Sequence, residues 1–171
     1  MVRILGALIL ITGTASWGLM SAAELSRRVT DLRTMVAAMQ LMRGEICSRL
    51  TPMPQVLKLV SAQTGSGVRK FFDNVSAGFS DIGSETFAQV WHSAARRTEE
   101  LHLDRAQLLI LDQLGQSLGK YDAARQEQAL DYAIARFEVF SRQAEQEKQA
   151  RARLHTFMGV AAGIFAVVIL L

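Results

Sequence analysis

The chain contains few of the residues from which catalytic and metal sites are built. It has one cysteine, Cys47, and three histidines, His92, His102 and His155. One cysteine excludes an intramolecular disulfide, and the histidines share no spacing that is typical of metal ligands. No glycine-rich loop ends in a lysine that could hold a phosphate. The sequence therefore indicates a protein that is not an enzyme and that binds no metal or cofactor.

A strong net charge is also missing from the central part of the chain. Of the 19 lysines and arginines, all except Arg3 lie between residues 24 and 155, together with all 16 acidic residues, so the net charge there is +2. A nucleic-acid-binding domain carries a concentrated basic surface. This balance argues against nucleic acid as a partner.

Charged residues are absent from both ends of the chain. None occurs from Ile4 to Ala23, and none from Thr156 to Leu171. A membrane-spanning helix needs roughly 20 apolar residues to cross about 30 Å of hydrocarbon. The C-terminal stretch, counted from Leu154, reaches roughly 27 Å as a helix. We therefore predict two spans in the lipid bilayer with one domain between them: an N-terminal helix over 1–23, a helical domain over 24–155 and a C-terminal helix over 156–171.

Basic residues next to the two predicted spans indicate their orientation. Arg27, Arg28, Arg33, Lys148, Arg151 and Arg153 lie on the domain side, whereas the far side has only Arg3. Lysine and arginine are enriched on the cytoplasmic side of membrane proteins, so the domain is expected in the cytoplasm. An alternative remains open. The first span could be a signal peptide cleaved after Ser21-Ala22-Ala23, which would leave a secreted helical domain.

The apolar residues of the domain recur at spacings of three and four, which is typical of amphipathic helices. No segment has the alternation of a strand. The first helix is expected to end at Leu50, and Thr51, Ser84, Asp104 and Asp122 are expected to cap the helices that follow. The last helix should continue into the second span. Two long helices around three or four short ones predict an all-α, antiparallel helical bundle.

Small residues in the predicted spans follow a pattern that permits close helix packing. Gly159 and Gly163 form a G-x-x-x-G pair, and Gly18 ends a similar small-residue pair with Thr14. Such spacings let two membrane helices approach closely. Glycine is also common in membrane helices without such a role.

Several short motifs occur in a recognisable order along the chain. They are Leu5-Gly6-Ala7 with Gly18 later, Glu45-Ile46 followed by Thr51-Pro52, the run Leu114-Gly115-Gln116-Ser117-Leu118-Gly119-Lys120-Tyr121-Asp122, and Met158-Gly159 before the apolar end. Over almost its full length, the chain resembles stage III sporulation protein AB of endospore-forming bacteria.

The resemblance implies a structural role in a membrane complex. The family is similar to the cytoplasmic helical domain of the platform proteins of type II secretion and type IV pilus machines. It implies a non-catalytic subunit of the channel between mother cell and forespore, placed in the mother-cell-derived membrane around the forespore. The expected partners are a secretion-type ATPase, which the subunit would couple to the membrane complex, and other small membrane proteins of the channel. A generic membrane-anchored adaptor is the alternative.

The resemblance also suggests roles for individual residues. Glu45 matches an acidic position of the family pattern, and Glu45 and Arg49 are expected on the exposed side of the first helix, where they could contact a partner. A solvated or capping glutamate is the alternative for Glu45. Gly115, Gly119 and Asp122 are expected to shape the junction between the last two helices.

Overall fold

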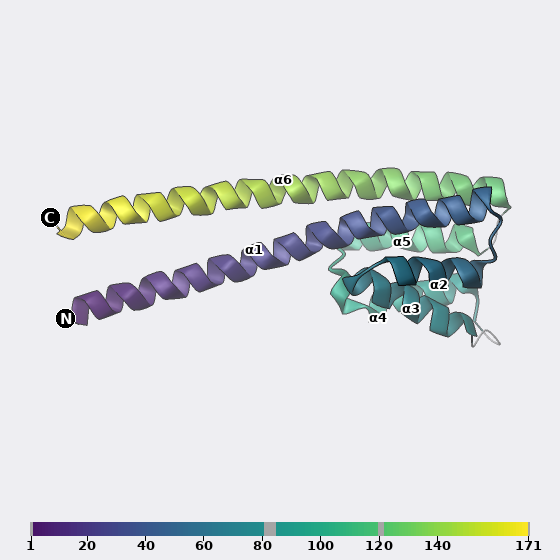
Figure 1. Ribbon diagram of the computed structural model, residues 1–171, viewed down its shortest axis with the longest axis horizontal. Coiled ribbons are helices and arrows are strands. Elements are labelled where there is room, and N and C mark those ends of the chain that lie inside the picture. The colour runs from purple at the N-terminus through teal and green to yellow at the C-terminus, as the bar shows by residue number, and fades with distance from the viewer. Residues whose placement is uncertain (1, 81–84, 120–121, 171) are drawn as a thin grey trace. The chain divides into compact units, whose positions relative to one another are not determined.

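The computed structural model describes residues 2–80, 85–119 and 122–170, with side chains for residues 23–65, 67–79, 85–119 and 122–152. Every regular element in these ranges is a helix (Figure 1), which confirms the all-α prediction. The α-helices are α1 (Val2–Arg43), α2 (Met53–Gln63), α3 (Ser66–Ser80), α4 (Phe87–Arg97), α5 (Arg105–Leu118) and α6 (Ala123–Leu170). A π-helix, η1 (Gly44–Ser48), follows α1, and a 3₁₀ turn, η2 (Glu99–Leu101), follows α4.

The chain divides into two units. One contains Met1–Arg27 and Gln143–Leu171, and the other, called the helical domain below, is Arg28–Arg142. Where the structure describes the chain, no helix is both long enough and apolar enough to cross a membrane. The side chains of both predicted spans lie outside the described residues, apart from Ala23. Gly18, Gly159 and Gly163 belong to this undescribed set, so the spans and their boundaries stay predictions.

The two long helices are continuous where they pass from one unit to the other. Helix α1 has 42 residues and α6 has 48 (Figure 1), as the absence of helix breakers predicted. Within the helical domain, Arg43 of α1 binds two carboxylates of α6. Its Nη2 lies 2.7 Å from Glu127 Oε1, and its Nε lies 2.6 Å from Asp131 Oδ1. These ion pairs fix the end of α1 against the beginning of α6.

The core of the helical domain combines an aliphatic stripe with an aromatic cluster. Helical spacing predicts one apolar stripe on the first helix, made of Leu32, Met35, Val36, Met39, Met42, Ile46 and Leu50. All of these are buried except Val36, which is partly exposed, and Leu50. Leu50 was expected to end this stripe and does not, as described below. The aromatic cluster joins α3 to α4, because Trp91 packs edge-to-face on Phe71 and Phe72, with ring centroids 4.9 and 5.9 Å apart.

Trp91 also fixes the distance between α4 and α5. Its indole Nε1 donates a hydrogen bond of 2.8 Å to the carbonyl of Leu111. The indole lies directly against Gly115, where an added Cβ would come within 2.3 Å of Trp91 Cδ1. Only glycine permits this approach, because it has no Cβ. The indole of Trp91, the largest buried side chain, therefore packs directly on the backbone of α5.

The helix starts agree only partly with the predicted caps. Asp104 caps α5 through a capping box with Gln107, and Asp122 accepts a hydrogen bond from the Arg125 backbone at the start of α6; both were predicted. The other two predictions are wrong. Pro52, and not Thr51, is the N-cap of α2. Thr86 caps α4, whereas Ser84 lies outside the described residues.

Candidate interaction surfaces

The residues with catalytic potential are separated in the structure. His92 Nδ1 lies 2.9 Å from Asp112 Oδ1, and His102 Nδ1 lies 3.1 Å from the buried carboxylate of Asp31. The His92–Asp112 pair joins α4 to α5, and the His102–Asp31 pair joins the residue after η2 to α1. Among the described side chains, no three histidine, cysteine, aspartate or glutamate residues are grouped so that they could hold a metal ion. His155 lies outside the described side chains.

Cys47 is a partly buried thiol in the π-helix η1. Burial raises the pKa of this thiol above its ordinary value, and the negative charge of Glu127 raises it further. A raised pKa lowers the fraction of reactive thiolate near neutral pH. These surroundings are the opposite of those that activate a nucleophilic cysteine.

Glu45 lies inside the protein and not on the exposed side of α1 as expected. Only 5% of its surface is exposed. Its Oε1 accepts a hydrogen bond of 2.6 Å from Arg49 Nη1, and its Oε2 accepts one of 2.8 Å from the Thr51 hydroxyl. The Glu45 carbonyl also accepts from the Thr51 backbone N–H at 2.9 Å. Through these hydrogen bonds, Glu45 fixes the backbone that follows the end of α1. Arg49 is exposed, as expected.

The segment fixed by Glu45, residues 44–52, is called the 44–52 turn below. It exposes Leu50, which has 74% of its surface in solvent and a backbone φ of 53°. A left-handed conformation costs a non-glycine residue roughly 1–2 kcal/mol, and π-helical turns are frequent at functional sites. Both the exposed apolar side chain of Leu50 and its strained backbone are unfavourable in the isolated chain. Leu50 is therefore a candidate contact residue, and helical spacing did not indicate it.

The first helix was predicted to end at Leu50, but its last, π-helical turn ends at Ser48, so Leu50 lies outside the helix. A π-helical turn closes with an i→i+5 hydrogen bond, so it contains one residue more than an α-helical turn. Arg49 N–H bonds to the Gly44 carbonyl in this way, at 3.3 Å. The helix ends one residue before Arg49, and the left-handed backbone of Leu50 takes its side chain off the buried face, four residues after Ile46.

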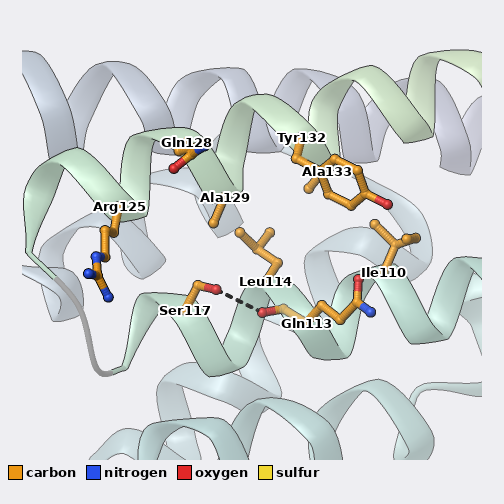
Figure 2. A pocket seen from close by; sticks show the side chains of 9 residues that line it. All are labelled: Ile110, Gln113, Leu114, Ser117, Arg125, Gln128, Ala129, Tyr132 and Ala133. Carbon is orange, nitrogen blue, oxygen red and sulfur yellow. Dashed lines mark hydrogen bonds between the residues drawn. The ribbon is translucent and has the colours of Figure 1, made fainter.

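A second surface feature is an open groove of about 640 Å³ between α5 and α6 (Figure 2). In Figure 2, Leu114 of α5 points toward Ala129 of α6, and the Tyr132 ring lies at the edge above Ile110. Tyr132 is 53% exposed, and Leu109, one turn before Gln113, is 57% exposed. The groove is lined by Ile110, Gln113, Leu114, Ser117, Arg125, Gln128, Ala129, Tyr132 and Ala133.

The predicted junction residues lie at the contact of α5 with α4 and at the start of α6. Gly115 is inside α5 against Trp91, and Gly119 is the C-cap of α5. Gly119 has a φ of −88° and not the left-handed conformation expected of a glycine after a helix. A Cβ at Gly119 would lie 3.2 Å from the Cβ of Phe87. Close packing on α4 is therefore the constraint that the structure displays at both glycines.

Comparison with known proteins gives a consistent result. The model of the family described as stage III sporulation protein AB matches residues 3–171. A curated relative, stage III sporulation protein AB of Bacillus subtilis (strain 168), is 24% identical over 172 residues, which cover 100% of both chains. A solved structure of a stage III sporulation protein AB is 25% identical, with a TM-score of 0.67 over 72% of this chain and 98% of that one.

Proposed function

The chain belongs to the stage III sporulation protein AB family, and we propose that it acts as a non-catalytic structural subunit of a secretion-like channel between mother cell and forespore. In this role it couples a secretion-type ATPase to the membrane complex. Family membership supports a part in sporulation and favours this proposal over a generic membrane-anchored adaptor. The separated His92 and His102 pairs, and the raised pKa of Cys47, support a role without catalysis.

The observation that carries the ATPase contact is the 44–52 turn. Protein–protein contacts combine an apolar centre with a polar rim, and arginine is enriched among their binding hot spots. Here Leu50 provides the apolar side chain, exposed Arg49 lies beside it, and buried Glu45 holds both in one conformation. The proposed contact therefore consists of Leu50 and Arg49, with Glu45 acting through the backbone that it fixes.

The membrane arrangement is part of the same proposal. Two terminal spans would anchor the chain in the mother-cell-derived membrane around the forespore, with the helical domain in the cytoplasm, where an ATPase is accessible. The charge asymmetry of the sequence supports this orientation. The spans, with Gly18, Gly159 and Gly163 available for close packing, would contact the other small membrane proteins of the channel.

Substitution of Leu50 tests the ATPase contact. We expect Leu50→Asn in the full chain, reconstituted in lipid nanodiscs, to bind the cognate ATPase about 10- to 100-fold more weakly, because a buried leucine contributes about 1.5–3 kcal/mol. Asparagine tolerates the left-handed conformation, so the fold should be retained. Biolayer interferometry gives the affinity, and circular dichroism gives the helix content.

Leu109→Asn is the matched control, because it makes the same substitution at another exposed leucine, in α5. Loss of binding at position 50 with retention at position 109 supports the proposal. Equal affinities of the Leu50→Asn variant and the parent chain would show that the 44–52 turn is not the ATPase contact.

A further inference from the structure

We propose that the helical domain contacts anionic phospholipid headgroups through three arginines, Arg96, Arg97 and Arg105, which are called the basic surface below. This inference rests on the predicted N-terminal span, because the membrane must begin where that span ends. It goes beyond the proposed function, since it assigns to the helical domain a lipid contact of its own. Two contacts between α1 and the residues before α5 place the basic surface, and its charge determines which lipids it attracts.

The residues before α5 are held against the part of α1 that is closest to the predicted span. Arg28 Nη2 of α1 lies 2.9 Å from Oδ2 of Asp104, which is the N-cap of α5. Three residues further along α1, the buried carboxylate of Asp31 lies 3.1 Å from His102 Nδ1. The start of α5 therefore lies beside the first turn of α1 that belongs to the helical domain.

The spacing along α1 brings this contact close to the headgroup layer. Helix α1 is continuous from Val2 to Arg43, and Arg28 follows Ala23, the last residue of the predicted span, by five positions. Five residues of a helix extend over roughly 7.5 Å, and the headgroup region of a bilayer is roughly 5–7 Å thick on each side. Exposed charges interact over about 8 Å at physiological salt. A charge at the start of α5 is therefore within reach of the headgroups.

The end of α4 lies at the same end of the helical domain as the start of α5. Trp91 of α4 donates its hydrogen bond to Leu111 of α5. Phe87, the first residue of α4, lies against Gly119, which follows the last residue of α5. The two helices therefore run in opposite directions, and the last turn of α4 lies next to the first turn of α5.

The basic surface is formed by these two helix ends. Arg96 and Arg97 are the last two residues of α4, and Arg105 is the first residue of α5. All three are exposed, and in the part of the chain that the structure describes none of them forms an ion pair. A guanidinium group matches the geometry of phosphate oxygens and can bind two of them at once. The three side chains can therefore bind the phosphates of lipid headgroups.

Most acidic side chains near the basic surface are already paired. Asp104 pairs with Arg28, and Glu100 pairs with Lys70 of α3. Glu99 is exposed between α4 and α5, so three arginines and one glutamate give a net charge of +2. Each basic residue at an anionic membrane surface strengthens binding by about fivefold, so a charge of +2 favours contact by roughly 25-fold.

Fluorescence quenching by lipid headgroups tests this contact in the full chain. A bimane label is attached in a Cys47→Ala background either at Ala106→Cys, on the first turn of α5, or at Gln116→Cys, roughly 15 Å further along α5. The nanodiscs contain phosphatidylcholine with a spin-labelled headgroup, either in phosphatidylcholine alone or in an equal mixture with phosphatidylglycerol. Quenching at position 106 should increase at least about twofold with phosphatidylglycerol, and high salt should remove this increase. Quenching at position 116 should be weak in both lipids.

Removal of charge shows which residues make the contact. Replacement of all three arginines of the basic surface by glutamine should abolish the increase at position 106. The control variant Lys58→Gln/Arg136→Gln/Arg142→Gln removes the same charge from exposed positions of α2 and α6, and it should keep the increase. Circular dichroism checks that each variant retains its helix content.

Three results would overturn the proposal. Equal quenching at position 106 in the two lipid mixtures would exclude a contact with anionic headgroups. An equal increase at positions 106 and 116 would show that the lipid does not act on this end of α5. A lipid effect that survives replacement of the three arginines would assign the contact to other residues.

The same samples separate this proposal from the proposed function. Failure of the chain to elute together with the nanodiscs would reject the predicted spans, and the lipid contact with them. If the lipid effect is absent and the arginine variant instead loses affinity for the cognate ATPase, the basic surface is part of the ATPase contact. None of the quenching results affects the test at Leu50.

Discussion

Replacing Gly115 by alanine should destabilise the helical domain strongly, although alanine is the better helix former. The added Cβ would lie 2.3 Å from Trp91 Cδ1 and 2.6 Å from Trp91 Cγ. The indole cannot move aside easily, because it is 1% exposed, packs on Phe71 and Phe72, and donates to the Leu111 carbonyl. The clash must therefore be relieved by separation of α4 from α5 or by displacement of the indole.

Three contributions determine the expected size of the effect. Overpacking of a filled core costs about 1–3 kcal/mol. Displacement of the indole breaks its buried hydrogen bond, which costs about 1–3 kcal/mol. Replacing a helical glycine by alanine returns about 1 kcal/mol. The net loss should be about 1–5 kcal/mol, against a total stability of about 5–15 kcal/mol for a domain of this kind.

Urea unfolding of the full chain in detergent micelles, followed by circular dichroism at 222 nm, measures this loss. Gly44→Ala is the control, because an added Cβ there has no heavy atom within 4 Å, and it should be neutral or slightly stabilising. Trp91→Phe in the Gly115→Ala background should recover part of the loss, with a coupling energy of about 1–3 kcal/mol. An unfolding free energy of Gly115→Ala within about 0.5 kcal/mol of the parent would refute the reasoning.

Four other outcomes are expected. Phe137→Ala should cost about 3–5 kcal/mol of unfolding free energy, because its side chain is fully buried; a loss below about 0.5 kcal/mol would contradict this. Glu45→Gln should cost about 1–3 kcal/mol, because a carboxylate that accepts two hydrogen bonds is lost; unchanged urea unfolding would show that the carboxylate does not fix the turn. Cys47 should react with iodoacetamide more slowly than a free cysteine at pH 8, since its raised pKa leaves less thiolate, and its rate should increase with pH and in Glu127→Gln; a rate equal to that of free cysteine would be inconsistent with the raised pKa. A reporter fused to the C-terminus should behave as extracytoplasmic, and a cytoplasmic signal would reject the proposed orientation.

The parts of the fold that depend on local sequence could be predicted. The stripe from Leu32 to Ile46 follows helical spacing, and Asp104 caps the residues directly after it, so both are visible in the sequence. Thr86 could also have been recognised, because Thr86 and Gln89 have the spacing of a capping box. Ser84 has a residue type suited to capping, but Phe87 follows it by three positions, so the glutamine three residues after Thr86 is the better criterion.

The candidate surfaces depend on information that helical periodicity does not contain. The helix ends at Ser48 after a π-helical turn, and Leu50 then takes a left-handed conformation, neither of which helical spacing indicates. Burial of Glu45 depends on Arg49 and Thr51 folding back toward it. The groove exists because the small residue Ala129 faces Leu114 across two helices, which is a property of tertiary packing.

The ion pairs between α1 and α6 impose an order on folding during synthesis. Helices α2 to α5 pack on their neighbours in the sequence, and contacts between close segments form early. Arg43, by contrast, can pair with Glu127 only after 84 further residues have been synthesised. At roughly 5–20 residues per second, a ribosome needs about 4–17 s to supply it. During this interval Arg43 has no carboxylate of α6 to bind, so the end of the first helix to be translated is fixed later than the contacts among α2 to α5.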